Sequence, residues 1–314
     1  MKIIRAEHLG MCFGVRDAIA LAVKESAAAP LTILGGLVHN ETVLAGLRAR
    51  GIKIEEQLAS VATPSVMITA HGTSQRALNA VKRAGLNVLE ATCPLVRVAH
   101  EAIMGLAAQG YHPVIIGQRE HVEVRGLTGD LDAFDVVLQG ADVPALQARA
   151  RFGVAAQTTQ PIARVEELVG LIRRRFPNSE VRFIDTVCRP TKQRQTAAVE
   201  LARRCDVVVV IGGGHSNNSR ELTATCRHYC ARVHQVSDAS GLRREWFAGA
   251  RSVGITAGTS TPDSAIEEVQ ARLENWSNDY ERPETLGDGC AIRNGDGVGG
   301  IGRGVLSAHA IRPD

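Results

Sequence analysis

The sequence predicts an α/β protein with largely parallel sheets, because short apolar runs alternate with amphipathic stretches of helical periodicity along most of the chain. Each apolar run is followed by small or polar residues, as expected where a strand leads into the N-terminus of a helix. The length of 314 residues suggests about two domains of ordinary size and allows a sizeable buried core.

The candidate strands are short runs rich in valine and isoleucine. In chain order they are Lys2–Arg5, Leu31–Leu34, Val66–Thr69, Val88–Glu90, Pro113–Ile116, Val136–Leu138, Gly153–Ala155, Val181–Ile184, Val207–Ile211 and Ser252–Thr256. Between them, apolar residues recur at helical spacing. The candidate helices include Arg16–Glu25, Val96–Ala108, Val165–Arg175, Gln195–Arg204 and Pro262–Trp276.

Composition argues against several classes of protein. No apolar run approaches the ~18 residues of a membrane-spanning helix, and the N-terminus has no signal-peptide pattern. A net charge of +3 and an aromatic content of 4% argue against nucleic acid as the main partner. The end of the chain differs from the rest, since eight of the 18 positions between Gly287 and Gly304 are glycine. We expect residues 281–314 to form a flexible tail in which Cys290 has no catalytic part.

Cysteine usage is the first informative count. The chain has seven cysteines, an odd number, and no export signal, which predicts reduced thiols in the cytoplasm. No Cys-x-x-Cys pair is present, so the local signatures of zinc ribbons, thioredoxin-like sites and ferredoxins are missing. If cysteines bind a metal, distant parts of the fold must bring them together.

A polar residue follows nine of the ten candidate strands, at the start of the next helix. These residues fall into three sets: Cys12, His39 and His71; Cys93, His121 and Thr158; Cys188, Ser216 and Ser260. In every set the second member follows the cysteine by 27 or 28 residues. This near-constant interval indicates a threefold internal repeat in which each unit contributes one thiol and two polar groups.

If three such units face one axis, three thiolates meet there. Three thiolates can bind three irons of a [4Fe–4S] cluster and leave the fourth iron open for a substrate. The alternative for each cysteine is a buried and inert side chain. We assign Cys205, Cys226 and Cys230 to that alternative.

A second signal indicates phosphate binding. The run from Gly212 to Ser219 opens a helix after an apolar strand, and Ser216, Asn217 and Asn218 add polar donors there. It lacks the patterns of ordinary nucleotide sites. Three histidines lie at helix starts, where each could bind phosphate or merely cap the helix. Glu123 follows His121 by two residues, and it is either a proton relay or an acid favoured by the helix dipole.

These motifs together resemble one family. They are Gly10-Met11-Cys12-Phe13-Gly14-Val15, Val38-His39-Asn40, Ala70-His71-Gly72, Ala91-Thr92-Cys93-Pro94, His121-Val122-Glu123, Gln157-Thr158-Thr159, Cys188-Arg189-Pro190-Thr191-Lys192-Gln193-Arg194-Gln195, Ser216-Asn217-Asn218-Ser219 and Thr256-Ala257-Gly258-Thr259-Ser260-Thr261-Pro262-Asp263. In order and spacing, residues 1 to about 280 resemble the 4-hydroxy-3-methylbut-2-enyl diphosphate reductase family, which catalyses the last step of the non-mevalonate isoprenoid pathway.

The resemblance implies a trefoil of three pseudo-threefold-related α/β units around a central iron–sulfur site. The units would be residues 1–93, 94–190 and 191–280. The implied activity removes the allylic hydroxyl of the substrate as water and yields isopentenyl and dimethylallyl diphosphate. Electrons would come from a ferredoxin or flavodoxin.

The resemblance also assigns roles to residues. Cys12, Cys93 and Cys188 match the ligands of a [4Fe–4S] cluster with one open iron, and Glu123 matches the proton donor, with Thr158 beside it. The implied substrate-binding residues are His39, His71, His121, Thr158, Ser216, Asn217, Asn218 and Ser260.

Several positions depart from the family pattern. Val122 stands in place of proline, Asn217 of serine, His215 of asparagine, Glu90 of aspartate and Pro190 of a small residue. None of these changes removes an implied ligand or the proton donor.

Two other functions remain as alternatives. One is a cluster-bearing redox sensor on the same fold, which would need neither Glu123 nor Thr158. The other is a structural phosphate-binding module without metal, which would be colourless and free of iron.

Overall fold

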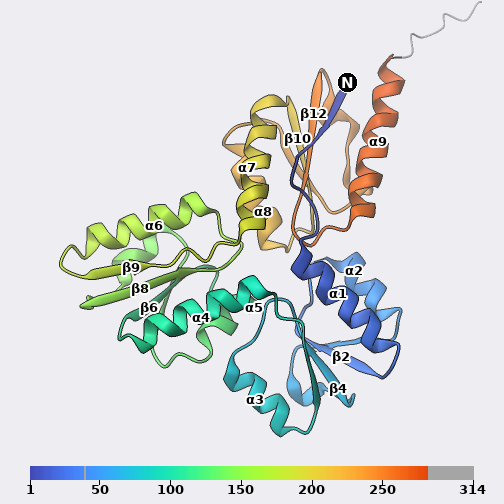
Figure 1. The fold of residues 1–314 in the computed structure, drawn as a ribbon. Helices are drawn as coiled ribbons and strands as arrows, with labels where there is room; N and C mark the ends of the chain where they lie inside the picture. Colours follow the sequence, from blue (N-terminus) through green and yellow to red (C-terminus); the bar gives the residue numbers. More distant parts are fainter. Residues whose placement is uncertain (39, 282–314) are drawn as a thin grey trace, which may run out of the picture.

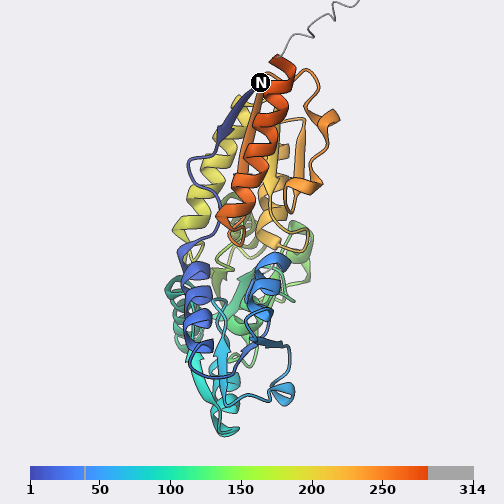
Figure 2. The same ribbon diagram turned by 90° about the vertical axis from the view of Figure 1, so that its right-hand side faces the viewer.

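The computed structural model describes residues 1–38 and 40–281, which form three α/β lobes around a common centre (Figures 1 and 2). Each lobe is built on one four-stranded sheet in which every pair of neighbouring strands runs parallel. The predicted α/β class and trefoil arrangement are therefore confirmed. Apart from Glu281, the predicted tail at residues 281–314 lies outside the described residues.

The three sheets share one strand order. In space, the first-lobe sheet is β3 (Lys53–Glu55), β2 (Leu31–Leu34), β4 (Ser65–Ile68) and β5 (Asn87–Glu90). The second-lobe sheet is β7 (Asp135–Val137), β6 (His112–Ile116), β8 (Arg151–Ala156) and β9 (Glu180–Phe183). The third-lobe sheet is β11 (Val233–Val236), β10 (Val207–Ile211), β12 (Ser252–Ala257) and β1 (Lys2–Arg5). In each sheet the connections reverse direction between the two central strands, which is where parallel sheets bind ligands.

The N-terminal strand β1 belongs to the third lobe. Lys2 to Arg5 pair in register with Ser252 to Ile255 of β12, so β1 occupies the edge that β5 and β9 occupy in the other sheets. Residues 1–93 were predicted as the first unit, and the structure differs there because that unit starts with a strand of the third sheet. Chain order does not reveal this, since the pairing joins the first strand of the chain to β12, the last of the twelve described strands.

The helices lie against the faces of the sheets (Figure 1). They are α1 (Phe13–Ser26), α2 (Glu41–Arg48), α3 (Gln75–Arg83), α4 (Pro94–Ala108), α5 (Val122–Thr128), α6 (Ile162–Arg175), α7 (Arg189–Arg204), α8 (Asn217–Arg227) and α9 (Asp263–Glu281). Successive residues of a strand face opposite sides of its sheet. In β10, Val208 packs with Leu222 on the α7–α8 side, whereas Val209 packs with Val269 of α9 on the other.

Every predicted strand overlaps a strand of the structure, but two edge strands escaped prediction. These are β3 and β11, whose sequences Lys-Ile-Glu and Val-His-Gln-Val are short and partly polar. An edge strand pairs on one side only, so it needs less apolar surface than a central strand and leaves a weaker signal. The prediction that Cys205, Cys226 and Cys230 are buried is confirmed, since all three pack in the core of the third lobe.

Polar contacts join the lobes to one another. Asp130 of the second lobe accepts hydrogen bonds from the backbone N–H groups of Gln75 (2.6 Å) and Arg76 (2.9 Å), which begin α3 of the first lobe. Asp130 therefore caps a helix of the neighbouring lobe. Arg164 of α6 pairs with Glu221 of α8 at 2.8 Å, which joins the second and third lobes.

Candidate active site at the centre of the three lobes

Three thiols mark the centre of the molecule. Cys12, Cys93 and Cys188 follow the edge strands β1, β5 and β9 and are the N-cap residues of α1, α4 and α7. Each of these helices packs on the lobe after the one that supplied the strand. The thiols therefore lie where the chain passes between lobes.

One small cavity, here called the inner cavity, is lined by all three thiols. His71, Glu123 and Thr158 also line it, and its apolar walls include Phe13, Leu95 and Val96. The approach of the lobes is close, because a methyl group added at Gly14 of α1 would lie 2.7 Å from Sγ of Cys93.

The donor set of the inner cavity fits a polynuclear iron–sulfur group. Within residues 1–38 and 40–281, no three His, Cys, Asp or Glu side chains are placed to hold a single metal ion. Thiolates that bind different irons of one cluster need not converge on a single point as the ligands of one ion must. The described cysteines carry free thiols, and thiolates are the ligands that iron–sulfur clusters take.

Without a cation, the inner cavity disfavours thiolates. Burial is the main cause that raises the pKa of the Cys93 and Cys188 thiols, and the nearby thiol of Cys12 and carboxyl of Glu123 raise both further. Hydrogen bonding opposes this at Cys188, whose Sγ lies 3.1 Å from the hydroxyl of Thr191. A bound metal reverses this balance, because its positive charge holds thiol ligands deprotonated.

The carboxyl group of Glu123 is the acid of this site. It is 1% exposed, and its Oε1 accepts the backbone N–H of Thr158 at 2.6 Å while its Oε2 accepts the Thr158 hydroxyl at 3.0 Å. Burial raises its pKa to about 7, although both hydrogen bonds from Thr158 act to lower it. At neutral pH the group therefore exists in both protonation states, which suits a general acid.

Two histidines lie between the inner cavity and the outside. The rings of His71 and His121 meet edge to face, with centroids 5.5 Å apart. Nδ1 of His121 accepts the backbone N–H of Glu123 at 3.2 Å. In the neutral tautomer assigned from this contact, Nε2 of His121 carries the proton and is a donor.

The third lobe supplies neutral polar groups to a second cavity, here called the middle cavity. Ser216, Asn217, Asn218 and Ser260 line it together with His71 and His121. Nδ2 of Asn217 and Oγ of Ser260 are buried without a protein partner, although buried polar groups are normally paired. These donors, at the start of α8 and in the turn after β12, suit an anionic ligand.

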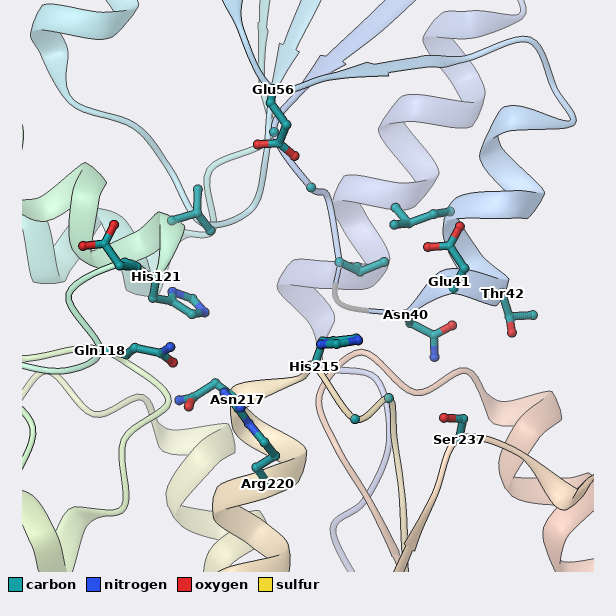
Figure 3. A pocket seen from close by; sticks show the side chains of 18 of the residues that line it. Asn40, Glu41, Thr42, Glu56, Gln118, His121, His215, Asn217, Arg220 and Ser237 are labelled. Atoms are coloured by element: carbon teal, nitrogen blue, oxygen red, sulfur yellow. The ribbon is translucent and has the colours of Figure 1, made fainter. Parts of the chain in front are cut away.

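The middle cavity lies beside two other spaces. It shares His71, Thr159 and Thr259 with the inner cavity, and His121 and Asn217 with a larger outer pocket of about 580 Å³. Figure 3 shows that this outer pocket takes side chains from all three lobes. Its labelled side chains are Asn40, Glu41, Thr42, Glu56, Gln118, His121, His215, Asn217, Arg220 and Ser237.

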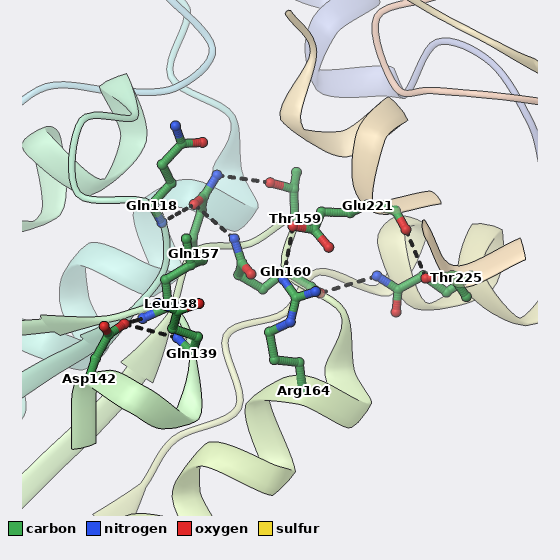
Figure 4. Close-up of polar contacts among 11 residues, drawn as sticks. Gln118, Leu138, Gln139, Asp142, Gln157, Thr159, Gln160, Arg164, Glu221 and Thr225 are labelled. Carbon is green, nitrogen blue, oxygen red and sulfur yellow. Dashed lines mark hydrogen bonds and ion pairs between the residues drawn. The ribbon is translucent and has the colours of Figure 1, made fainter. Parts of the chain in front are cut away.

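The turn that carries Thr158 is supported by glutamine side chains (Figure 4). Oε1 of Gln157 accepts the backbone N–H of Gln118 at 3.1 Å and Nε2 of Gln160 at 3.2 Å. Nε2 of Gln157 donates to the hydroxyl of Thr159 at 3.1 Å. The Arg164–Glu221 ion pair lies nearby and joins the segment after this turn to α8.

Most of the predicted site residues come together in this way. His39 lies outside the described residues, so its placement remains a prediction. Of the departures from the family pattern, His215 faces the outer pocket and Glu90 pairs with Arg97 at 3.6 Å. Sequence reasoning missed Thr159 and Thr259, which line both the inner and middle cavities and directly adjoin Thr158 and Ser260.

No described helix combines the length and apolar character needed to cross a membrane.

The fold and site define a three-lobed α/β enzyme with a thiol-lined centre. A family model for LytB protein matches residues 3–274, and the chain belongs to this family. The 4-hydroxy-3-methylbut-2-enyl diphosphate reductase of Anaeromyxobacter sp. (strain Fw109-5) is 35% identical over 289 residues, which cover 91% of this chain and 100% of that protein. The reductase of the same name from Aquifex aeolicus (strain VF5) is 37% identical over 281 residues, which cover 87% and 96%.

Two solved structures are similar to this fold. One is (E)-4-hydroxy-3-methyl-but-2-enyl diphosphate reductase, the terminal enzyme of the non-mevalonate pathway, with 35% identity, a TM-score of 0.63 and coverage of 88% of this chain and 100% of that chain. The other is the E-1-hydroxy-2-methyl-but-2-enyl-4-diphosphate reductase from Plasmodium falciparum, with 26% identity, a TM-score of 0.81 and coverage of 87% and 88%.

Proposed function

We propose that this chain reduces 4-hydroxy-3-methylbut-2-enyl diphosphate to isopentenyl and dimethylallyl diphosphate. The substrate takes up two electrons and two protons, its allylic C–O bond breaks, and the oxygen leaves as water. One observation carries the proposal: three thiols at helix N-termini share a cavity with the buried Glu123–Thr158 pair, and polar donors line the adjoining middle cavity. The named activity of the relatives supports the same reaction.

Cys12, Cys93 and Cys188 would hold a [4Fe–4S] cluster with one iron lacking a protein ligand. When bound, such a cluster supplies single electrons and a Lewis-acidic iron for the alcohol oxygen. A ferredoxin or flavodoxin would deliver the electrons, and the reaction would take place in the cytoplasm.

The middle cavity would bind the diphosphate. His71, His121, Ser216, Asn217, Asn218 and Ser260 would donate hydrogen bonds to its oxygens, and His39 would join them. The unpaired donors of Asn217 and Ser260 acquire a partner in this arrangement. Binding energy from the diphosphate would fix the reacting end of the substrate in the inner cavity, since the phosphates lie away from the bond that breaks.

Glu123 would protonate the departing oxygen. Hydroxide is a poor leaving group, so a proton supplied at this atom lowers the barrier to C–O cleavage. The two hydrogen bonds from Thr158 hold the carboxyl in one orientation, and the Thr158 hydroxyl would orient the substrate oxygen. The apolar walls of the inner cavity limit the access of bulk water to the reacting carbons.

The redox-sensor alternative is less well supported. A sensor would need three thiols. It has no use for a buried acid with a pKa near 7 or for a cavity lined by hydrogen-bond donors that suit an anion. No feature of the described residues favours a metal-free phosphate-binding module, because such a module has no need of three thiols at one cavity.

Anaerobic turnover tests the proposal. The purified, reconstituted and chemically reduced protein should convert synthetic 4-hydroxy-3-methylbut-2-enyl diphosphate into both products, detected by mass spectrometry. A protein that holds a cluster but forms neither product would favour the sensor. A colourless protein without iron or sulfide would favour the metal-free module.

A further inference from the structure

Arg194 is an unusual cation for a protein interior. It lies on α7, six residues after Cys188, and it is 7% exposed. Its hydrogen bonds go to two carbonyl oxygens, from Nε to Gly10 at 3.0 Å and from Nη1 to Pro190 at 3.0 Å. Among the residues that the structure describes, no carboxylate forms an ion pair with the Arg194 guanidinium or acts on its pKa.

The two carbonyls place the guanidinium between two of the three thiol segments. Gly10 precedes Cys12 by two residues, and Pro190 follows Cys188 by two residues. One side chain thus bridges the loop that enters α1 and the first turn of α7. Burial lowers the pKa of the Arg194 guanidinium and the nearby Arg16 adds to this, whereas Cys12 and Cys188, when ionised, act to raise it.

A buried charge without an opposite charge nearby is costly, and arginine cannot relieve this cost by losing its proton. Arg16, by contrast, is exposed and pairs with Asp263 at 2.9 Å, so solvent and a carboxylate offset its charge. No carboxylate of the described residues offsets the charge of Arg194. The thiolates and the redox group that they bind would supply the offsetting negative charge.

We propose that Arg194 is the fixed counter-charge of the central redox group and raises its reduction potential, so that a one-electron donor can reduce it. This inference rests on the proposed function. Reduction adds one negative charge to the centre, and a nearby buried cation stabilises the reduced form more than the oxidised form. Arg194 is thus a positioning residue: it acts through the charge of the redox group, and it lines neither the inner nor the middle cavity.

The alternative is a purely structural role, in which the guanidinium only holds the two segments together. Two substitutions separate these roles, because Arg194→Gln removes the charge and Arg194→Lys keeps it, while both disrupt the two-carbonyl bridge. Arg97→Gln is a matched control, since Arg97 lies one turn after Cys93 but is exposed and pairs with Glu90 at 3.6 Å.

The experiment measures the midpoint potential of the anaerobically reconstituted proteins by a spectroscopic redox titration, with iron content determined for each. We expect Arg194→Gln to shift the one-electron equilibrium at least tenfold towards the oxidised form, which is 59 mV more negative. We expect Arg194→Lys to lie near the wild-type potential, and Arg97→Gln to match it, because water screens an exposed charge.

Each outcome decides the question. An Arg194→Gln protein with full iron and an unchanged potential would overturn the inference, as would an Arg194→Lys potential as low as that of Arg194→Gln. If Arg194→Gln cannot hold iron, retention of iron at the wild-type potential by Arg194→Lys supports the charge role, and loss in both variants establishes a structural role. A wild-type protein that takes up no iron refutes the proposed function instead.

Discussion

Thr158 donates two hydrogen bonds to the carboxyl group of Glu123, from its backbone N–H at 2.6 Å and from its hydroxyl at 3.0 Å. The two residues lie 35 positions apart, but they follow the neighbouring central strands β6 and β8. Carboxyl ends of parallel strands meet at one edge of a sheet, so this edge brings the acid and its partner together. The Thr158 bonds stabilise the ionised carboxyl, and burial opposes them more strongly.

Replacing Glu123 with glutamine should remove the proton donor and keep the shape of the site. We expect kcat to fall by about 10² to 10⁴-fold, the usual contribution of a general acid, with iron content unchanged. In the wild type, kcat/KM should fall as pH rises through about 7, because the carboxyl of the free protein then loses its proton. A pH–rate profile of both proteins measures this. A variant as active as the wild type would show that the proton comes from another group.

The same substitution should change how stability depends on pH. The folded-state pKa of Glu123, about 7, is above its ordinary value of 4.5, so the folded protein binds the extra proton between these pH values. The contribution of Glu123 to wild-type stability should therefore be fully present below about pH 4.5 and should be lost as pH rises through about 7. Glu123→Gln lacks this loss, and we expect it to gain up to about 3 kcal/mol on the wild type between pH 5 and 8. Urea unfolding of the cluster-free proteins measures the difference, and parallel stability curves would contradict it.

The Thr158 hydroxyl should tune the acidity of Glu123. Thr158→Val removes the hydroxyl but keeps the backbone N–H, so the ionised carboxyl loses one of its two donors. We expect the alkaline limb of the kcat/KM profile to move up by about one pH unit or more, since a hydrogen bond to a charged group contributes about 1.5–3 kcal/mol. Thr158→Ser, which keeps a hydroxyl, is the control and should titrate like the wild type. Identical profiles for the valine and serine variants would separate the hydroxyl from the acid.

Gly14 should be needed for the packing of Cys93. In Gly14→Ala, the added carbon would lie 2.7 Å from Sγ and 3.0 Å from Cβ of Cys93, so the thiol must move. We expect a loss of about 1–3 kcal/mol and a lower iron content. Gly105→Ala in α4 is the control, because no atom outside its own helix lies within 4 Å of the added carbon. It should stabilise the protein by about 0.5–1 kcal/mol through helix propensity. Equal iron content and stability in the two variants would contradict the packing argument.

The sequence was sufficient to predict every strand except the edge strands β3 and β11, together with the polar residues that follow the predicted strands. Buried central strands such as Val207–Ile211 carry a strong apolar signal, and the residue after each strand is readable once the strand is located. The grouping of those residues was less accessible. The prediction placed Cys12 in one set with His39 and His71. In the structure, the strands before His39 and His71 share a sheet with the strand before Cys93. The strand before Cys12 belongs to the third sheet.

Other features needed coordinates. Arg194 is one of many arginines in the sequence, and only the fold places it beside Gly10 and Pro190 in a buried position. The pairing of β1 with β12 joins segments far apart in the sequence that no local pattern connects. The unit boundaries after residues 93 and 190 stay predictions, as do the roles assigned to the site residues.

The most direct test of the central claim is the iron and sulfide content of the anaerobically purified protein and four variants. We expect about four irons and four sulfides per wild-type chain, and large losses in Cys12→Ser, Cys93→Ser and Cys188→Ser, because a hydroxyl is a poor ligand for this soft-ligand site. Cys226→Ala, which alters a buried thiol of the third-lobe core, should keep its iron. A wild-type protein without iron, or a full cluster in any of the three serine variants, would contradict the account.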